Sequence, residues 1–273
     1  MLVSRSLFLL VAHFSAGLIL PLLLLARDEF GPTFDRLVLA TAGLLVLGAV
    51  WFEPTAREGA AAFFRGEWGG GNLATFLFLV VGGASLLAAA YSPRSREVWI
   101  GAIGGVAMVA VALDGAAFTG PVPLPGLGWI LHPFSAFSGA LVLGTGWVAM
   151  LGGHWYLVNP TLPIEPLVRL SRVAHGAIVL RGVVAVGAVA WWWFFFDPAA
   201  ANWGELLDGV NTFLLGRLLL GIALPFGGLF LVVAAARIRS TQSATGIMYF
   251  TFLFVLAGEL MAGYVLIRSG IPI

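Results

Sequence analysis

The chain has 273 residues, of which 60% are hydrophobic and only 10% are charged, and its formal net charge at pH 7 is +1. A mean hydropathy of +1.00 excludes an ordinary soluble domain, because the surface of such a domain requires far more charged residues. The absence of cysteine excludes disulfides, thiolate-bound iron–sulfur clusters, covalent c-type haem and cysteine-bound zinc.

Eight apolar segments recur along the chain, at the length needed to cross a hydrocarbon core about 30 Å thick. The longest connection between them, about Glu53 to Leu73, is too short for a soluble domain. The first segment is long and lacks a clear cleavage site, which indicates a helix rather than a signal peptide. We therefore predict an all-α, polytopic membrane helix bundle of about eight transmembrane helices, a single integral membrane domain over residues 1–273, with spans at 5–26, 36–52, 74–91, 98–118, 132–157, 170–196, 211–236 and 246–267.

The arginines predict the orientation of the bundle, since cytoplasmic loops collect basic residues. Eight arginines fall in the loops on one side and four on the other, which places both termini outside. All fourteen basic residues are arginine, which is compatible with a high-GC bacterial gene, so we expect a multi-pass protein of the bacterial inner (cytoplasmic) membrane. The eight are Arg27, Arg36, Arg94, Arg96, Arg169, Arg172, Arg237 and Arg239, and the four are Arg5, Arg57, Arg65 and Arg268.

The connection after the second span carries Phe63 and Phe64 between Arg57 and Arg65. Aromatic side chains flanked by arginines are typical of a helix that lies on a membrane surface. We expect a short helix over 58–68 on the outer surface, with a partner-docking loop as the alternative.

Five polar residues from five predicted helices share the outer half of the membrane: His13, Asp114, His132, Arg217 and Glu259. Ionisable groups at membrane depth are costly, so their default interpretation is functional. Quinol oxidation requires an apolar slot, hydrogen-bond partners for the ring oxygens and a proton acceptor. His13 and Asp114 suit that chemistry, and Arg217 with Glu259 can form an ion pair. In the structural alternative the pair only stabilises the bundle, Asp114 caps a loop and His13 bonds a neighbouring carbonyl.

Two further histidines lie near the inner face, His154 at the end of the fifth span and His175 near the start of the sixth. Helices joined by a short loop are usually neighbours, and two imidazoles at equal depth can hold a b-type haem iron. Arg181 lies six residues beyond His175, and we count it and His132 among the candidate cofactor-binding residues. The alternative is that both histidines are interfacial structural residues. A second haem between His13 and His132 is disfavoured. His132 and His154 are about 33 Å apart along their helix, so two haems at these positions would be too far apart for rapid electron transfer.

The end of the chain, from Arg217 through LLLGIALP at 218–225 to LAGELMAGYVLIRSG at 256–270, resembles the closing helices of the polysulfide-reductase-type quinol-interacting membrane subunits. The opening helix LFLLVAHFSAGLIL at 7–20, the eight-helix count and the exterior N-terminus are similar to that family as well. The resemblance implies a haem-free membrane anchor that exchanges electrons between quinone and an iron–sulfur partner subunit. The segment GHWYLVNP at 153–160 departs from the family's pattern and leaves a b-cytochrome variant open.

These observations predict a quinone-linked electron-transfer subunit of a larger redox complex, with menaquinone or ubiquinone as the quinone. At most it is a quinol/quinone oxidoreductase subunit that acts with iron–sulfur or cytochrome partners, in contact with lipid and without nucleic acid. A secondary transporter is one alternative, because Pro21 and Pro225 interrupt apolar helices. A non-catalytic membrane assembly or anchor subunit is the other, since abundant glycine suits lateral helix packing.

Overall fold

A computed structural model of the chain defines residues 2–25, 29–52, 54–66, 80, 82, 83, 86, 128–195 and 212–273. Every regular element in these residues is helical. The α-helices are α1 (Leu2–Ile19), α2 (Pro32–Phe52), α3 (Pro54–Phe64), α6 (Gly128–Val158), α7 (Glu165–Phe195), α9 (Leu224–Arg237) and α10 (Thr241–Ser269), with a 3₁₀ segment η1 (Leu20–Leu24) and a π-helical segment η3 (Leu219–Ala223).

Six stretches of the described helices are long and apolar enough to cross a membrane: Ser4–Leu24, Pro32–Ala49, Ile130–Val158, Glu165–Phe194, Thr212–Arg237 and Thr241–Ser269. They coincide with six of the eight predicted spans, which supports a multi-pass membrane protein in contact with lipid. The predicted spans at 74–91 and 98–118 lie almost entirely outside the described residues. α7 begins at Glu165, five residues before the predicted start of its span at 170.

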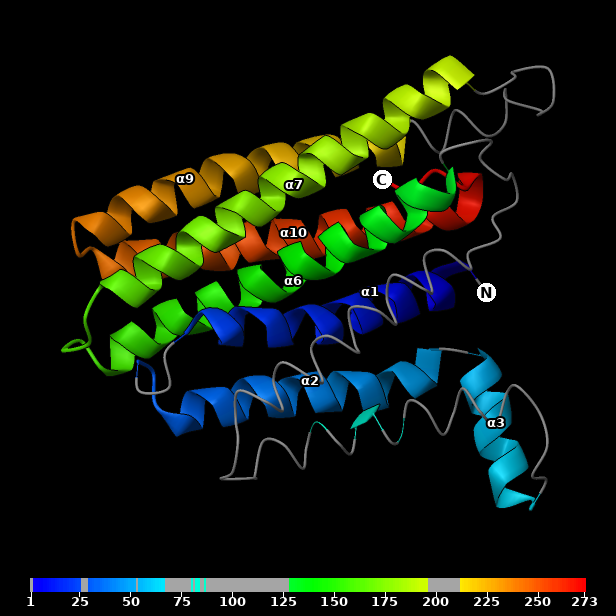
Figure 1. The fold of residues 1–273 in the computed structure, drawn as a ribbon, viewed down its shortest axis with the longest axis horizontal. Helices are drawn as coiled ribbons and strands as arrows, with labels where there is room; N and C mark the ends of the chain where they lie inside the picture. Colours follow the sequence, from blue (N-terminus) through cyan, green and yellow to red (C-terminus); the bar gives the residue numbers. More distant parts are fainter. Residues whose placement is uncertain are drawn as a thin grey trace.

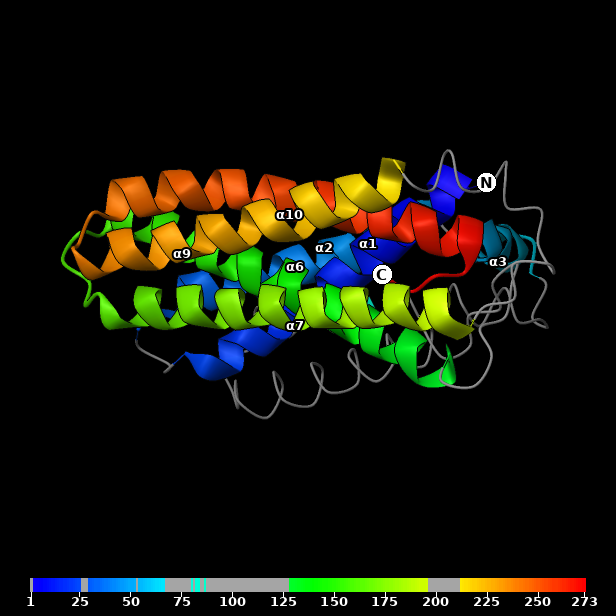
Figure 2. The same cartoon turned by 90° about the horizontal axis from the view of Figure 1, so that it is seen from above.

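The long helices run side by side along the long axis of the molecule (Figure 1), and the view from above shows them packed in more than one layer (Figure 2). α6 lies at the centre and packs against α1, α7 and α10. Both labelled chain ends lie at the same end of the bundle, and α3 crosses that end at a steep angle to α2 (Figure 1). The short helix expected near 58–68 is therefore present as α3, shifted by several residues toward the N-terminus.

Close approach of two helices requires glycine at Gly17 on α1 and Gly144 on α6. A Cβ atom added at Gly17 would overlap the main chain of Ala140, and one added at Gly144 would overlap the main chain of Gly17. Small residues allow this backbone contact, which van der Waals packing favours inside a bilayer. The contact fixes α1, and with it His13, against α6.

Two prolines, which lack an N–H group, lie where the helix type changes. α1 ends at Ile19 and continues as the 3₁₀ segment η1, which has Pro21 at its start. The π-helical segment η3 directly precedes the α9 turn that contains Pro225. Neither proline ends its apolar span, because the chain stays helical on both sides of each proline.

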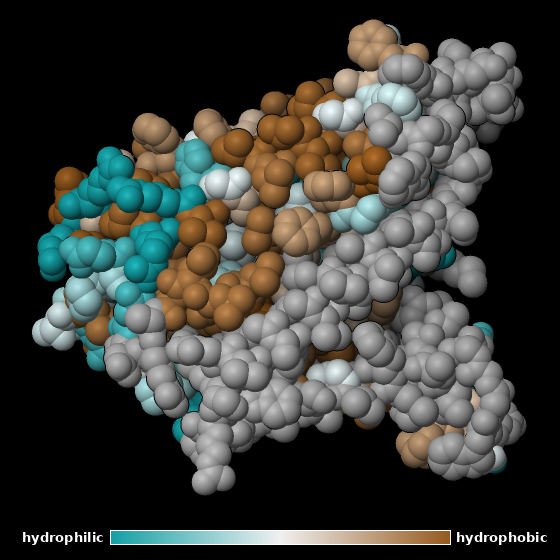
Figure 3. Space-filling view, viewed as in Figure 1, coloured by the Kyte–Doolittle hydropathy of each residue, from teal (hydrophilic) through white to brown (hydrophobic). Residues whose placement is uncertain are grey.

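Apart from the buried Arg181 and Arg217, the arginines near the ends of the described helices fall into two groups at opposite ends of the bundle. Arg36, Arg169, Arg172 and Arg237 lie at the helix ends remote from the chain termini, where Figure 3 shows hydrophilic surface. Arg5, Arg57, Arg65 and Arg268 lie toward the end with the termini. The described members of the two predicted groups of arginines thus lie at opposite ends of the bundle, and which end faces outward stays a prediction.

Candidate functional site

A buried cluster of charge joins α7, α10 and the helical turn before η3. Glu259 accepts hydrogen bonds from Arg181 Nε at 2.9 Å, from Arg181 Nη2 at 2.8 Å and from Arg217 Nη2 at 2.5 Å. The exposed fractions are 3% for Arg181, 0% for Arg217 and 6% for Glu259. Since an unpaired charge inside a bilayer is expensive, each of these groups depends on the others. The ion pair expected between Arg217 and Glu259 is present.

Arg181 has the most extensive hydrogen bonding in the cluster. Its Nη1 atom donates to the main-chain oxygen of Ser135 at 3.0 Å, to Ser135 Oγ at 2.8 Å and to Ser138 Oγ at 3.3 Å. Its Nη2 atom also donates to the main-chain oxygen of Ile273 at 2.7 Å. Arg181 therefore ties α7 to α6, to α10 and to the segment that follows α10.

The position of Arg181 differs from the sequence expectation, which grouped it with His154 and His175. Six residues separate Arg181 from His175, and a helix rises about 9 Å over that distance. This rise brings the guanidinium to the level of Glu259. Arg181 thus belongs to the same cluster as Arg217.

Arg217 is held in place by the interruption in its own helix. Pro225 has no N–H group to donate to the carbonyl four residues earlier, that of Gly221. Arg217 Nη1 donates to this carbonyl at 3.1 Å. A Cβ atom at Gly221 or at Gly258 would overlap the opposite glycine's Cα and crowd Arg217 Nη1. The π-helical segment therefore positions the arginine, as such segments often do at functional sites.

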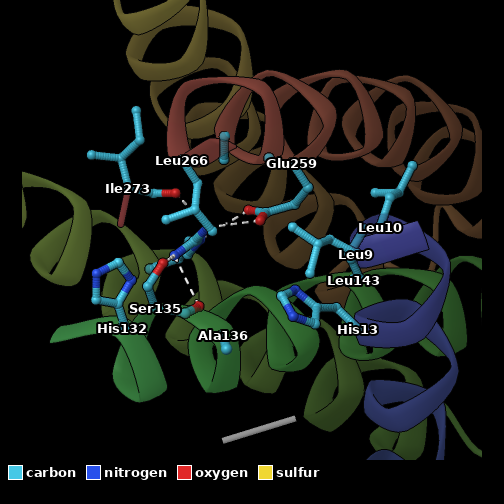
Figure 4. Close-up of a pocket in the computed structure, with 13 residues that line it drawn as sticks. Leu9, Leu10, His13, His132, Ser135, Ala136, Leu143, Glu259, Leu266 and Ile273 are labelled. Carbon is cyan, nitrogen blue, oxygen red and sulfur yellow. Dashed lines mark hydrogen bonds and ion pairs between the residues drawn. The ribbon is translucent and has the colours of Figure 1, made fainter. Parts of the chain in front are cut away.

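A pocket lies against this cluster, with two imidazoles on opposite sides of it (Figure 4). Its cavity volume is about 30 Å³, which is room for one or two water molecules. His13 Nε2 is buried and has no hydrogen-bond partner among the described residues. The lining residues are Leu9, Leu10 and His13 of α1, His132, Ser135, Ala136 and Leu143 of α6, Arg181 of α7, Glu259, Ala262, Gly263 and Leu266 of α10, and Ile273.

Four of the five candidate residues predicted for the outer half of the membrane lie at or next to the pocket. His13, His132 and Glu259 line the pocket, and Arg217 joins it through Glu259. Asp114 lies outside the described residues. Ser135, Ser138 and Ile273 were missed by sequence reasoning, because a serine or a main-chain oxygen carries no signal until its neighbours are known.

The two histidines predicted as a haem pair make contacts with different helices. The Nδ1 atom of His154 lies 3.3 Å from the hydroxyl of Tyr249 on α10. The ring of His175 packs against Phe226 of α9, with ring centroids 4.7 Å apart. These contacts do not test whether an iron porphyrin binds, so the haem stays a prediction. Across the described part of the chain, no three or more metal-binding side chains cluster.

The residues of the segment 153–160 make contacts that hold the end of α6 in place. Tyr156 is buried, and its hydroxyl donates to the main-chain oxygen of Pro163 in the turn between α6 and α7. The main-chain N–H of Asn159 donates to Trp155 at 2.9 Å, which closes the last turn of α6. His154 and Tyr156 thus anchor this end of α6 to α10 and to the turn.

Comparison of this chain with protein-family models, with curated proteins and with solved structures finds no match.

Proposed function

We propose that the chain is a quinone-linked electron-transfer subunit of a larger membrane redox complex, and that the pocket between α1, α6, α7 and α10 receives the quinone ring. The membrane is the bacterial inner membrane in this proposal, with the pocket in the half that faces outward. The partner that carries the electrons is an iron–sulfur or cytochrome subunit. The quinone is menaquinone or ubiquinone.

The observation that carries the proposal is the combination of an apolar wall with convergent polar groups inside a membrane span. Leu9, Leu10 and Leu266 supply apolar surface, while His13 and Arg181 present hydrogen-bonding atoms to the same pocket. Ring oxygens need such partners, and small-molecule sites are commonly apolar with a few placed polar groups. A purely structural ion pair would not need a histidine beside it with an unsatisfied buried nitrogen.

The chemistry that these residues supply is the handling of protons at the ring. The imidazole of His13 can accept a proton from a ring hydroxyl, since a neutral imidazole has an unprotonated ring nitrogen. The guanidinium of Arg181 holds an oxygen in place and favours negative charge on it. Glu259 supplies the negative charge that stabilises the two buried arginines at this depth. We therefore assign Glu259 the role of positioning Arg181 and Arg217.

The test is quinol oxidation by the purified complex. His13→Ala should lower the rate at least tenfold, because the ring hydroxyl loses its base. Ser15→Ala is the matched control: it lies on the same helix, and its hydroxyl donates to Ala42 at 2.8 Å, away from the pocket. A normal rate in His13→Ala, with Ser15→Ala also normal, would remove the pocket from quinol oxidation.

A secondary transporter is the second candidate, favoured by the π-helical interruption at the charge cluster. Discontinuous helices beside buried charge are typical of transport sites. Ion-driven or substrate-driven uptake in proteoliposomes would favour that function. In an assembly or anchor subunit, by contrast, every pocket substitution would leave the rate of the complex unchanged.

A further inference from the structure

The wall of the pocket is helical except at one position. Among the described lining residues, Ile273 alone lies outside a helix. It belongs to the segment Gly270–Ile273, which leaves α10 through a left-handed turn at Gly270, where φ is 79°. A short irregular segment can move without unpairing a helical ladder, whereas the helices that form the remaining wall cannot.

This segment is tied to the bundle by few hydrogen bonds. Beyond Gly270, the described bonds are from Ile271 N–H to Ser269 Oγ at 3.4 Å, from Ile273 N–H to Ile271 at 3.1 Å, and from Arg181 Nη2 to Ile273 at 2.7 Å. The Arg181 bond is the shortest of the three and the one that reaches another helix. Apolar packing adds to it, since Ile271 and Ile273 are 2% and 1% exposed.

The pocket is too small to hold a quinone ring unless part of its wall moves. A cavity of about 30 Å³ admits water, but a quinone ring is several times larger than a water molecule. Ring binding at this place therefore requires a part of the wall to move. The segment Gly270–Ile273 is the part with the fewest bonds to break.

We propose that the segment Gly270–Ile273 is the gate of the pocket, and that the main-chain oxygen of Ile273 occupies the position at Arg181 Nη2 that a ring oxygen takes when quinone binds. This inference rests on the proposed function and deepens it, because it names the group that occupies the ring-oxygen position at Arg181 before quinone binds. The exchange conserves a charge-assisted hydrogen bond, as the guanidinium gives up one oxygen acceptor for another. The side chain of Ile273 leaves at the same step and makes room for the ring.

The experiment measures binding of 2-methyl-1,4-naphthoquinone to the purified full chain and its variants, by quenching of tryptophan fluorescence. Removal of Ile273 takes its main-chain oxygen away from Arg181 Nη2 and enlarges the cavity, so the affinity should rise about tenfold, the value of one charge-assisted hydrogen bond. The control is Ile273→Ala, which enlarges the cavity but keeps the oxygen. Its affinity should rise less than that of the shortened chain, by about threefold at most.

A second pair of variants keeps all the residues of the segment. Gly270→Val strains the left-handed turn and loosens the gate, so binding should tighten several-fold. Gly270→Asn tolerates the left-handed conformation and should bind as the natural chain does. This pair gives an answer even if the chain without Ile273 does not fold.

Three results would overturn the gate. The first is unchanged or weaker binding in both the shortened chain and Gly270→Val. The second is an equal gain in Ile273→Ala and the shortened chain, which would mean that the oxygen at Arg181 does not matter. The third is the absence of naphthoquinone binding in every variant and in the natural chain, which would overturn the proposed function together with the gate.

Discussion

Arg181 and Glu259 face each other from α7 and α10 in a two-point ion pair, with Nε to Oε1 at 2.9 Å and Nη2 to Oε2 at 2.8 Å. The same carboxylate also forms an ion pair with Arg217. One acid therefore holds two cations inside the membrane-spanning part of the chain, and the pocket lies against this arrangement.

Removing the charge of Glu259 should destabilise the protein strongly. Glu259→Gln leaves Arg181 and Arg217 buried without a counter-charge, and breaking a buried pair costs about 3–5 kcal/mol of unfolding free energy. Thermal unfolding in detergent measures the change. Glu58→Gln on α3 is the control, because Glu58 is exposed and exposed charges contribute little. Equal unfolding midpoints in both variants would contradict the dependence of the arginines on Glu259.

The contact between Gly258 and Gly221 should tolerate no side chain. Gly258→Ala places a Cβ atom against Gly221 and Arg217 Nη1, and such overpacking costs about 1–3 kcal/mol. Gly246→Ala on the same helix meets nothing within 4 Å and should be neutral or slightly stabilising. The midpoints of thermal unfolding of the two variants in detergent measure the difference. If Gly258→Ala behaved like Gly246→Ala, the close approach of these helices would be wrong.

A b-type haem, if His154 and His175 ligate one, should give a reduced-minus-oxidised absorption band in the purified complex. His154→Ala and His175→Ala should each abolish that band, because the iron loses an axial ligand. His132→Ala should leave it intact. No band after haem supplementation would exclude the haem while leaving the quinone pocket as proposed.

The orientation of the chain can be measured directly, because it contains no cysteine. Ala61→Cys on α3 and Thr161→Cys in the turn after α6 occupy exposed positions at opposite ends of the bundle. With both termini outside, a membrane-impermeant maleimide applied to intact cells should label Ala61→Cys and spare Thr161→Cys. The opposite pattern would reverse the orientation.

Hydropathy predicted the long described helices well. In the hydrocarbon core a long apolar segment must hydrogen-bond its own backbone N–H and C=O groups, and a helix does so within one segment. The pairing of Arg217 with Glu259 was also predictable, since two opposite charges at similar depth rarely stay apart in lipid. Both predictions depend on depth along the membrane normal. Depth can be estimated by counting residues along a span.

The rotation of each helix about its axis, and the choice of its neighbouring helices, could not be predicted by counting residues. The contact of Arg181 with Glu259 joins residues 78 positions apart, and no spacing rule sets which faces of α7 and α10 meet. The same holds for His154 and His175, whose rings contact different helices although the helices are joined by a short turn. The role of Ile273 arises from a main-chain oxygen, which every residue has.

The measurement that tests the central claim most directly is photolabelling of the purified complex with an azidoquinone, followed by mapping of the labelled peptides. We predict that labels fall on the pocket-lining parts of α1, α6 and α10 near His13, His132 and Leu266, and that excess quinone prevents them. Labels confined to the lipid-facing side of α9, or labels that excess quinone does not reduce, would contradict a quinone site in this pocket.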